Sequence, residues 1–144
     1  MVLVEDKVRA EAAYSAVLAR VGSPTDAPAK ESGQLSTKDW KSYRTIVLKL
    51  PVMVHREGLP VALHFVAARG EPAQRFILDD LASDLGHKDS GALLAWARGL
   101  SPGQVRDHTR EIQRRLGWYK RVVQAFGRDG RDPSQPTTGL EATP

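Results

Sequence analysis

The chain has 144 residues, of which 41% are hydrophobic and 26% are charged, with a net charge of +4 at pH 7. This composition supplies one domain's core and excludes wholesale disorder, and the absence of cysteine excludes disulfides, thiol catalysis and cysteine-ligated metal centres. No segment is apolar for long enough to cross a bilayer, and the first residues lack the basic and apolar regions of a signal peptide, so we expect a cytoplasmic protein that contacts no membrane.

The first third of the chain predicts two helices joined by a flexible segment. Residues 2–20, rich in Ala and Glu, predict the first helix, and residues 22–35, with two glycines and two prolines, predict a mobile connector. Ser36 has the character of an N-cap for a second helix. Pro51 is expected to kink or interrupt that helix because proline lacks the backbone N–H and crowds the preceding turn. Gly58 is expected to end it in the left-handed conformation.

Four further helices follow. A proline near the start and a glycine past the end predict helices over residues 60–69 and 71–85. Asp89 or Ser90 can open a fifth helix, and Ser101 followed by Pro102 predicts the start of the last. No segment alternates polar and apolar residues as a strand does.

We therefore predict an all-α fold, a single compact bundle of about six helices with a Pro-kinked second helix and a long C-terminal helix. Residues 1–127 would form this helical domain. Residues 128–144 have no apolar periodicity and predict a disordered tail.

The last helix has two distinct sides. Its apolar side recurs at alternating spacings of four and three, at Val105, Thr109, Ile112, Leu116, Tyr119, Val123 and Phe126. Its other side carries a stripe of arginines: Arg106, Arg110, Arg114 and Arg121. Such a stripe is either a solvated face or a row that follows nucleic-acid phosphates, because successive turns are about 6 Å apart. The stripe alone leaves both interpretations open.

The basic surplus is confined to two parts of the chain. Residues 37–70 carry a net +4 and residues 101–128 a net +5, whereas residues 1–36, 71–100 and 129–144 carry −1, −2 and −2. Segregation of this kind favours contact with a polyanion or with a complementary protein surface, although helix patterning can also produce it.

No residue pattern predicts catalysis, a bound metal or a cofactor. Asp79, Asp80 and Asp84 form the one carboxylate cluster that can hold Mg²⁺, but they are interleaved with apolar residues as on any amphipathic helix. We expect His64 to be a packed or capping residue and His108 to lie in the core near the apolar side. The tryptophans are expected to anchor the core, at positions Trp40, Trp96 and Trp118.

The second and third predicted helices carry a combination of short motifs. These are Tyr43-Arg44, Leu48-Lys49-Leu50-Pro51, Gly58-Leu59 and Ala62-Leu63-His64-Phe65. Together they resemble the signature of the small helical subunit of the type III-B CRISPR effector, the Cmr complex. The resemblance covers about residues 2–126, leaves out the connector at 22–35, and is best over 43–86.

This resemblance implies a non-catalytic subunit of an RNA-guided antiviral complex. Such subunits stack head-to-tail in a minor filament, beside the large scaffold and backbone subunits, along the duplex of guide and target RNA. Lys and Arg would contact RNA phosphates without sequence preference, since base pairing supplies the selection. The candidate RNA-binding residues are Arg44, Lys49, Arg56, Arg106, Arg110, Arg114, Lys120 and Arg121.

Two alternatives remain at this point. The chain can be a helical spacer that binds other proteins and makes no direct RNA contact. It can also be a small enzyme that uses Asp79, Asp80 and Asp84 with a divalent ion.

Overall fold

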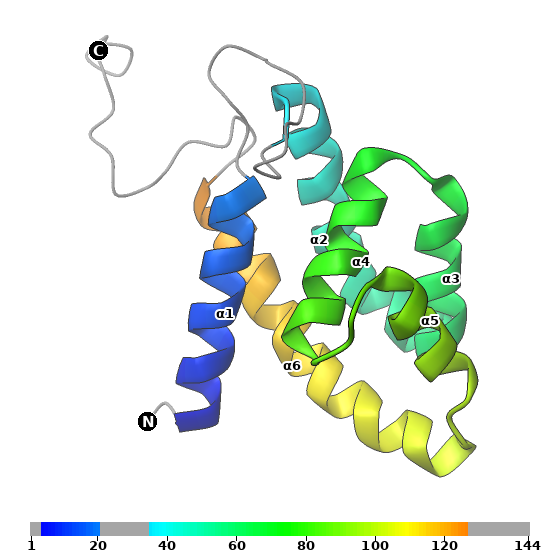
Figure 1. Ribbon diagram of the computed structural model, residues 1–144. Helices are drawn as coiled ribbons and strands as arrows, with labels where there is room; N and C mark the ends of the chain where they lie inside the picture. The colour runs from blue at the N-terminus through cyan, green and yellow to red at the C-terminus, as the bar shows by residue number, and fades with distance from the viewer. Residues whose placement is uncertain (1–3, 21–34, 127–144) are drawn as a thin grey trace, which may run out of the picture.

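The computed structural model describes residues 4–20 and 35–126, which form six helices and no strand (Figure 1). The helices are α1 (Val4–Arg20), α2 (Thr37–Glu57), α3 (Leu59–Arg69), α4 (Pro72–Asp84), α5 (Ser90–Arg98) and α6 (Pro102–Phe126). The predicted all-α fold is confirmed. The predicted tail and most of the predicted connector lie outside the described residues. None of these six helices has the length and apolar character that a bilayer crossing requires.

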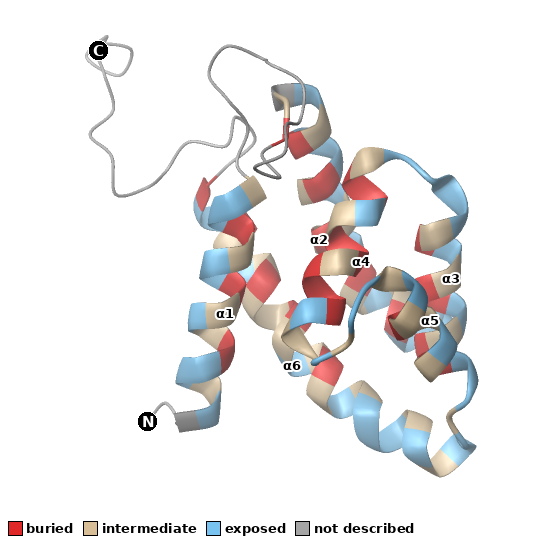
Figure 2. Ribbon diagram, in the orientation of Figure 1, coloured by how far each residue is buried: buried red, intermediate tan, exposed pale blue. Residues whose placement is uncertain are grey.

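Helix α6 connects the two sides of the bundle. It packs against α1 on one side and α2 on the other, while α3 and α4 pack on α2, and α5 packs on α3 and α4. The buried residues of the helices face one another across this arrangement (Figure 2). The largest buried side chains include Trp40, Tyr43 and Tyr119, all completely inaccessible to solvent. One continuous apolar core therefore joins the N-terminal helix to the C-terminal helix.

Side-chain caps fix where three helices begin, as the sequence predicted. Ser36 Oγ accepts the Asp39 N–H at 3.1 Å, and Asp89 Oδ1 accepts the Ala92 N–H at 2.9 Å. Ser101 and Gln104 form a reciprocal pair at the start of α6: the Ser101 N–H donates to Gln104 Oε1 and the Gln104 N–H donates to Ser101 Oγ. These bonds satisfy backbone donors that the first turn of a helix leaves without partners.

Gly58 ends α2 in a conformation other than the one expected. Its φ of 89° is positive, but its ψ of 154° is extended rather than left-handed helical. Its N–H donates to Val54 O at 3.0 Å, and its carbonyl accepts the Ala62 N–H at 3.0 Å. One residue thus terminates α2 and opens α3 directly, and glycine is required because a Cβ is strained at this φ.

Pro51 lies inside α2 without ending it, since the helix runs unbroken to Glu57. Leu35, placed at the end of the predicted mobile connector, is instead a core residue with no exposed surface. Its N–H donates to Arg20 O at 3.2 Å, so the residue before α2 is joined to the end of α1. Leu35 therefore packs in the core of the helical domain.

Candidate nucleic-acid interface

Helices α2 and α6 lie side by side and run antiparallel (Figure 1). Arg44 Nε donates to Val123 O at 3.2 Å, and Gln113 Nε2 donates to Pro51 O at 2.9 Å. Residues later in α2 therefore lie beside residues earlier in α6. These two bonds also identify the side of each helix that faces the other.

Helical periodicity places six cations of α2 and α6 on the same outward side of this helix pair. Both helices direct their buried residues, such as Leu50 and Leu116, toward the rest of the bundle. At about 100° per residue, the cations fall on the outward side, and in an antiparallel pair both sets then face the same way. We call this surface the basic face, and all six of its residues are exposed: Lys41, Lys49, Arg56, Arg110, Arg114 and Arg121.

The basic face continues into a groove between α2 and α3. A hollow of about 490 Å³ is lined by Lys41, Lys49 and Arg69, by small hydroxyl side chains of α2 and by one carboxylate, Glu71. A neighbouring hollow of about 510 Å³ shares Lys49, adds Arg56 and Glu57, and is otherwise apolar, with the exposed ring of Phe65 in its wall. The lysine, arginine and hydroxyl groups around this groove can donate hydrogen bonds to phosphate oxygens.

Sequence reasoning missed Lys41 and Arg69. The position of Lys41, eight residues before Lys49, places both on one side of α2, and this spacing was a usable signal. For Arg69 there was no signal, because only the packing of α3 against α2 brings it to the groove.

The other predicted residues occupy different places on the same helix pair. Arg44 is half-buried and bound to the backbone of α6, so it joins the two helices. Lys120 is half-buried, and Arg106 is exposed in the first turns of α6. Among the described residues, the ion pairs within 4 Å use Arg9, Arg20 and Arg115, and none of the predicted RNA-binding residues takes part in them.

One tryptophan, Trp118, contacts a residue of the basic face. The Arg121 guanidinium lies 4.5 Å from the centre of the Trp118 ring, and this cation–π contact orients the arginine. The prediction of core tryptophans holds completely for Trp40, which is fully buried. Trp96 and Trp118 are half-buried and pack against the core from its edge.

The N-terminal part of α6 is less buried than its heptad pattern predicted. The apolar side is buried from Ile112 onward, whereas Val105 is half-buried. His108 is exposed, with its ring 4.9 Å from that of Trp96, so its prediction as a core residue is wrong. His64 is half-buried between Pro60 O, 2.8 Å from its Nδ1, and Arg98 Nη1, 2.9 Å from its Nε2.

The three carboxylates considered as an Mg²⁺ site form hydrogen bonds or ion pairs with other residues of the protein. Asp80 Oδ1 pairs with Arg20 Nη2 at 2.7 Å, and the Tyr43 hydroxyl donates to Asp80 Oδ2 at 2.7 Å. Burial raises the pKa of Asp80, and burial likewise raises the pKa of Tyr43. Asp79 accepts the Ser90 N–H, and Asp84 pairs with Arg115. Within the described ranges, no three acidic or histidine side chains gather as a metal site requires.

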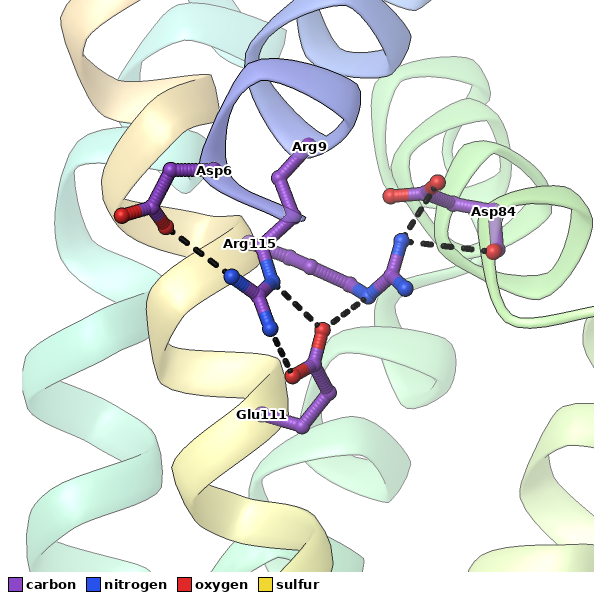
Figure 3. Close-up of polar contacts among 5 residues, drawn as sticks. All are labelled: Asp6, Arg9, Asp84, Glu111 and Arg115. Carbon is purple, nitrogen blue, oxygen red and sulfur yellow. Dashed lines mark hydrogen bonds and ion pairs between the residues drawn. The ribbon is translucent and has the colours of Figure 1, made fainter. Parts of the chain in front are cut away.

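A chain of ion pairs links α1, α6 and α4 (Figure 3). Arg9 Nη2 lies 2.6 Å from Glu111 Oε1, and Arg9 also pairs with Asp6. Arg115 Nε lies 2.8 Å from Glu111 Oε2, and Arg115 Nη1 lies 2.7 Å from Asp84 Oδ1. The hydrogen bond from Arg9, supported by the positive charge of Arg115, lowers the pKa of Glu111.

The lowered pKa of Glu111 predicts how stability depends on pH. Its ionised form contributes stability above the usual glutamate pKa of about 4.3, and this contribution is lost as pH falls through the lower pKa of the folded state. We expect Glu111→Gln to flatten the fall of the free energy of unfolding below about pH 4. Urea unfolding at a series of pH values measures this. Glu11→Gln, an exposed change on α1, should keep the wild-type slope.

Comparisons with known proteins agree with this architecture. The family model described as CRISPR-associated protein (Cas_Cmr5) matches residues 5–126. The CRISPR system Cmr subunit Cmr5 of Thermus thermophilus is 42% identical over 84 residues, which are 58% of this chain and 74% of that protein. The crystal structure of a CRISPR-associated Cmr5 family protein from the same organism has a TM-score of 0.69 and 32% sequence identity, covering 85% of this chain and 97% of that one. Because the family model, the relative and the solved structure agree over the helical domain, the chain belongs to the Cmr5 family of CRISPR-associated proteins.

Proposed function

We propose that this chain is the small, non-catalytic subunit of a type III-B CRISPR effector complex, the Cmr complex, in the cytoplasm. In this proposal it holds the backbone of guide or target RNA through the basic face and takes its place beside the other subunits. The sequence of the RNA is selected by base pairing, and the subunit contributes contacts that are the same for every guide.

The observation that carries this proposal is the basic face itself. Six exposed cations, which helical periodicity places on the outward side of two antiparallel helices, have no ion-pair partner among the described residues. A cation without a protein partner releases the counterions of a phosphate when it binds, which is the main source of sequence-independent affinity.

Stacking of successive copies is the second part of the proposal. A head-to-tail contact needs two different surfaces on each molecule. Exposed apolar side chains occur at two separate places, Val8 and Leu18 on α1, and Val52, Val61 and Phe65 on α2 and α3. Each copy can therefore present one of these surfaces to the other surface of the next copy.

The salt dependence of RNA binding tests the RNA contact. If six cations contact phosphates, the logarithm of the affinity for single-stranded RNA should fall with the logarithm of salt concentration with a slope of about −4. Two RNAs of unrelated sequence should bind equally. The double variant Arg110→Ala/Arg114→Ala should make the slope shallower by about 1.4. Gel-shift titrations from low to moderate salt measure all three quantities.

The matched control removes the same charge from another surface. Arg75 on α4 and Lys88 after α4 are exposed and lie outside the basic face, so Arg75→Ala/Lys88→Ala should keep the wild-type slope. Equal losses in both double variants would show that only net charge matters. No RNA retention at low salt would favour the alternative function, a helical protein-interaction spacer whose arginines pair with a neighbour's carboxylates.

A further inference from the structure

The hollow that Lys41 and Lys49 line between α2 and α3 also has an aromatic wall, and we call it the α2–α3 hollow. Its volume of about 490 Å³ is in the range of small-molecule sites, about 300–1,000 Å³. Phe65 of α3 lines it, and this side chain is 57% exposed, so a bound group can reach the ring. Exposed aromatic rings beside cations are the side chains on which single-stranded nucleic acids stack their bases.

The charges around the α2–α3 hollow favour an anion. Three exposed cations line it, Lys41, Lys49 and Arg69, against one carboxylate, that of Glu71. None of these four groups takes part in an ion pair within the described ranges. Glu71 is the N-cap of α4, and Gln74 of the first turn of α4 lines the same wall. The positive end of the α4 dipole therefore lies at this wall and adds to the positive potential.

We infer that the α2–α3 hollow binds one unpaired nucleotide of the RNA, with the base stacked on Phe65 and the phosphate held by Lys41 and Lys49. This inference rests on the proposed RNA contact and adds a contact with a base. A base inside a duplex is covered on both faces by its neighbours, so only an unpaired nucleotide offers a face to the ring. Because every base has such a face, stacking adds affinity without selecting a sequence. The exposed residues Val52 and Val61 do not line this hollow, so a neighbouring copy can still contact them.

Binding of two synthetic oligomers to the full chain tests the inference. One is a single-stranded RNA of about ten nucleotides, a usual site size, and the other is an abasic oligomer with the same ribose-phosphate backbone and no bases. Phe65→Ala should weaken binding of the RNA about tenfold, because a base loses its stacking partner, and should leave the affinity for the abasic oligomer unchanged. Lys49→Ala should weaken both to the same extent and make both salt slopes shallower by about 0.7. Fluorescence anisotropy measures these affinities.

Two further variants separate the ring from apolar surface in general. Phe65→Tyr keeps an aromatic ring and should retain the wild-type affinity for both oligomers. Val61→Ala removes an exposed apolar side chain one turn earlier on α3, outside the hollow, and should change neither affinity. Because Phe65 and Val61 are both more than half exposed, we expect all three substitutions to leave the helices intact, as circular dichroism would show.

The outcomes distinguish the base contact from the backbone contact. If Phe65→Ala weakened both oligomers equally, or neither, the inference of a stacked base would be overturned, while salt-dependent binding would still support the backbone contact. If the wild type bound neither oligomer at low salt, the inference and the proposed RNA contact would both be overturned.

Discussion

Asp80→Ala is expected to lower the free energy of unfolding by about 3–5 kcal/mol, because it breaks a buried ion pair from one side. The carboxylate is the partner of both Arg20 and Tyr43, and the Tyr43 side chain is completely buried. Without Asp80, the hydroxyl loses its acceptor in the core and the ion pair between Asp80 and Arg20 is lost. Urea unfolding followed by circular dichroism measures the change.

Two variants separate the charge of Asp80 from its hydrogen bonds. Tyr43→Phe removes one hydrogen bond and should cost about 1 kcal/mol. Asp79→Ala, at the neighbouring residue, removes only an acceptor for the Ser90 N–H and should also cost about 1 kcal/mol. If Asp80→Ala destabilised the protein no more than Asp79→Ala, Asp80 would not be the buried structural anion described above.

Arg115→Met should cost about 2–4 kcal/mol of the free energy of unfolding, the second large effect. Arg115 joins Glu111 on its own helix to Asp84 on α4, where the Asp84 side chain is only 9% exposed (Figure 3). Methionine keeps much of the aliphatic volume of arginine but leaves the Asp84 carboxylate without its counterion. Thermal or urea unfolding at pH 7 gives the difference.

The adjacent residue provides a matched control. Arg114 is exposed on the basic face, so Arg114→Met should change the free energy of unfolding by no more than about 0.5 kcal/mol. Arg114→Met should also weaken RNA binding. Arg115→Met should not, because Arg115 lies in the ion-pair chain and not on the basic face. Equal destabilisation by the two substitutions would mean that the chain of ion pairs contributes nothing to stability.

The positions where helices begin and end could be predicted well, because the residues that determine them act locally. Caps at Ser36, Asp89 and Ser101 and the glycine at Gly58 act within one helical turn, so the sequence around each is sufficient. Even so, the backbone angles at Gly58 differ from those expected. Helix α3 follows at once, and its first hydrogen bond uses the Gly58 carbonyl.

The candidate site could be predicted only in part. Arg110, Arg114 and Arg121 were selected from periodicity within one helix, and all three side chains are exposed. Asp80 was considered for a metal site because its spacing from Asp84 puts both on one side of α4. Spacing within a helix does not reveal that Arg20, sixty residues away, occupies that carboxylate.

The sequence by itself determined the helices, their order, the two-sided character of α6 and the likeness to the Cmr5 family, since each depends on residues close together along the chain. Only the tertiary structure decided which charges are used inside the protein and which face outward. Arg9 and Glu111 are 102 positions apart, and their contact depends on how α1 packs against α6. Arg69 joined the groove for the same reason: neighbours in space are set by helix packing, which periodicity along one helix cannot encode.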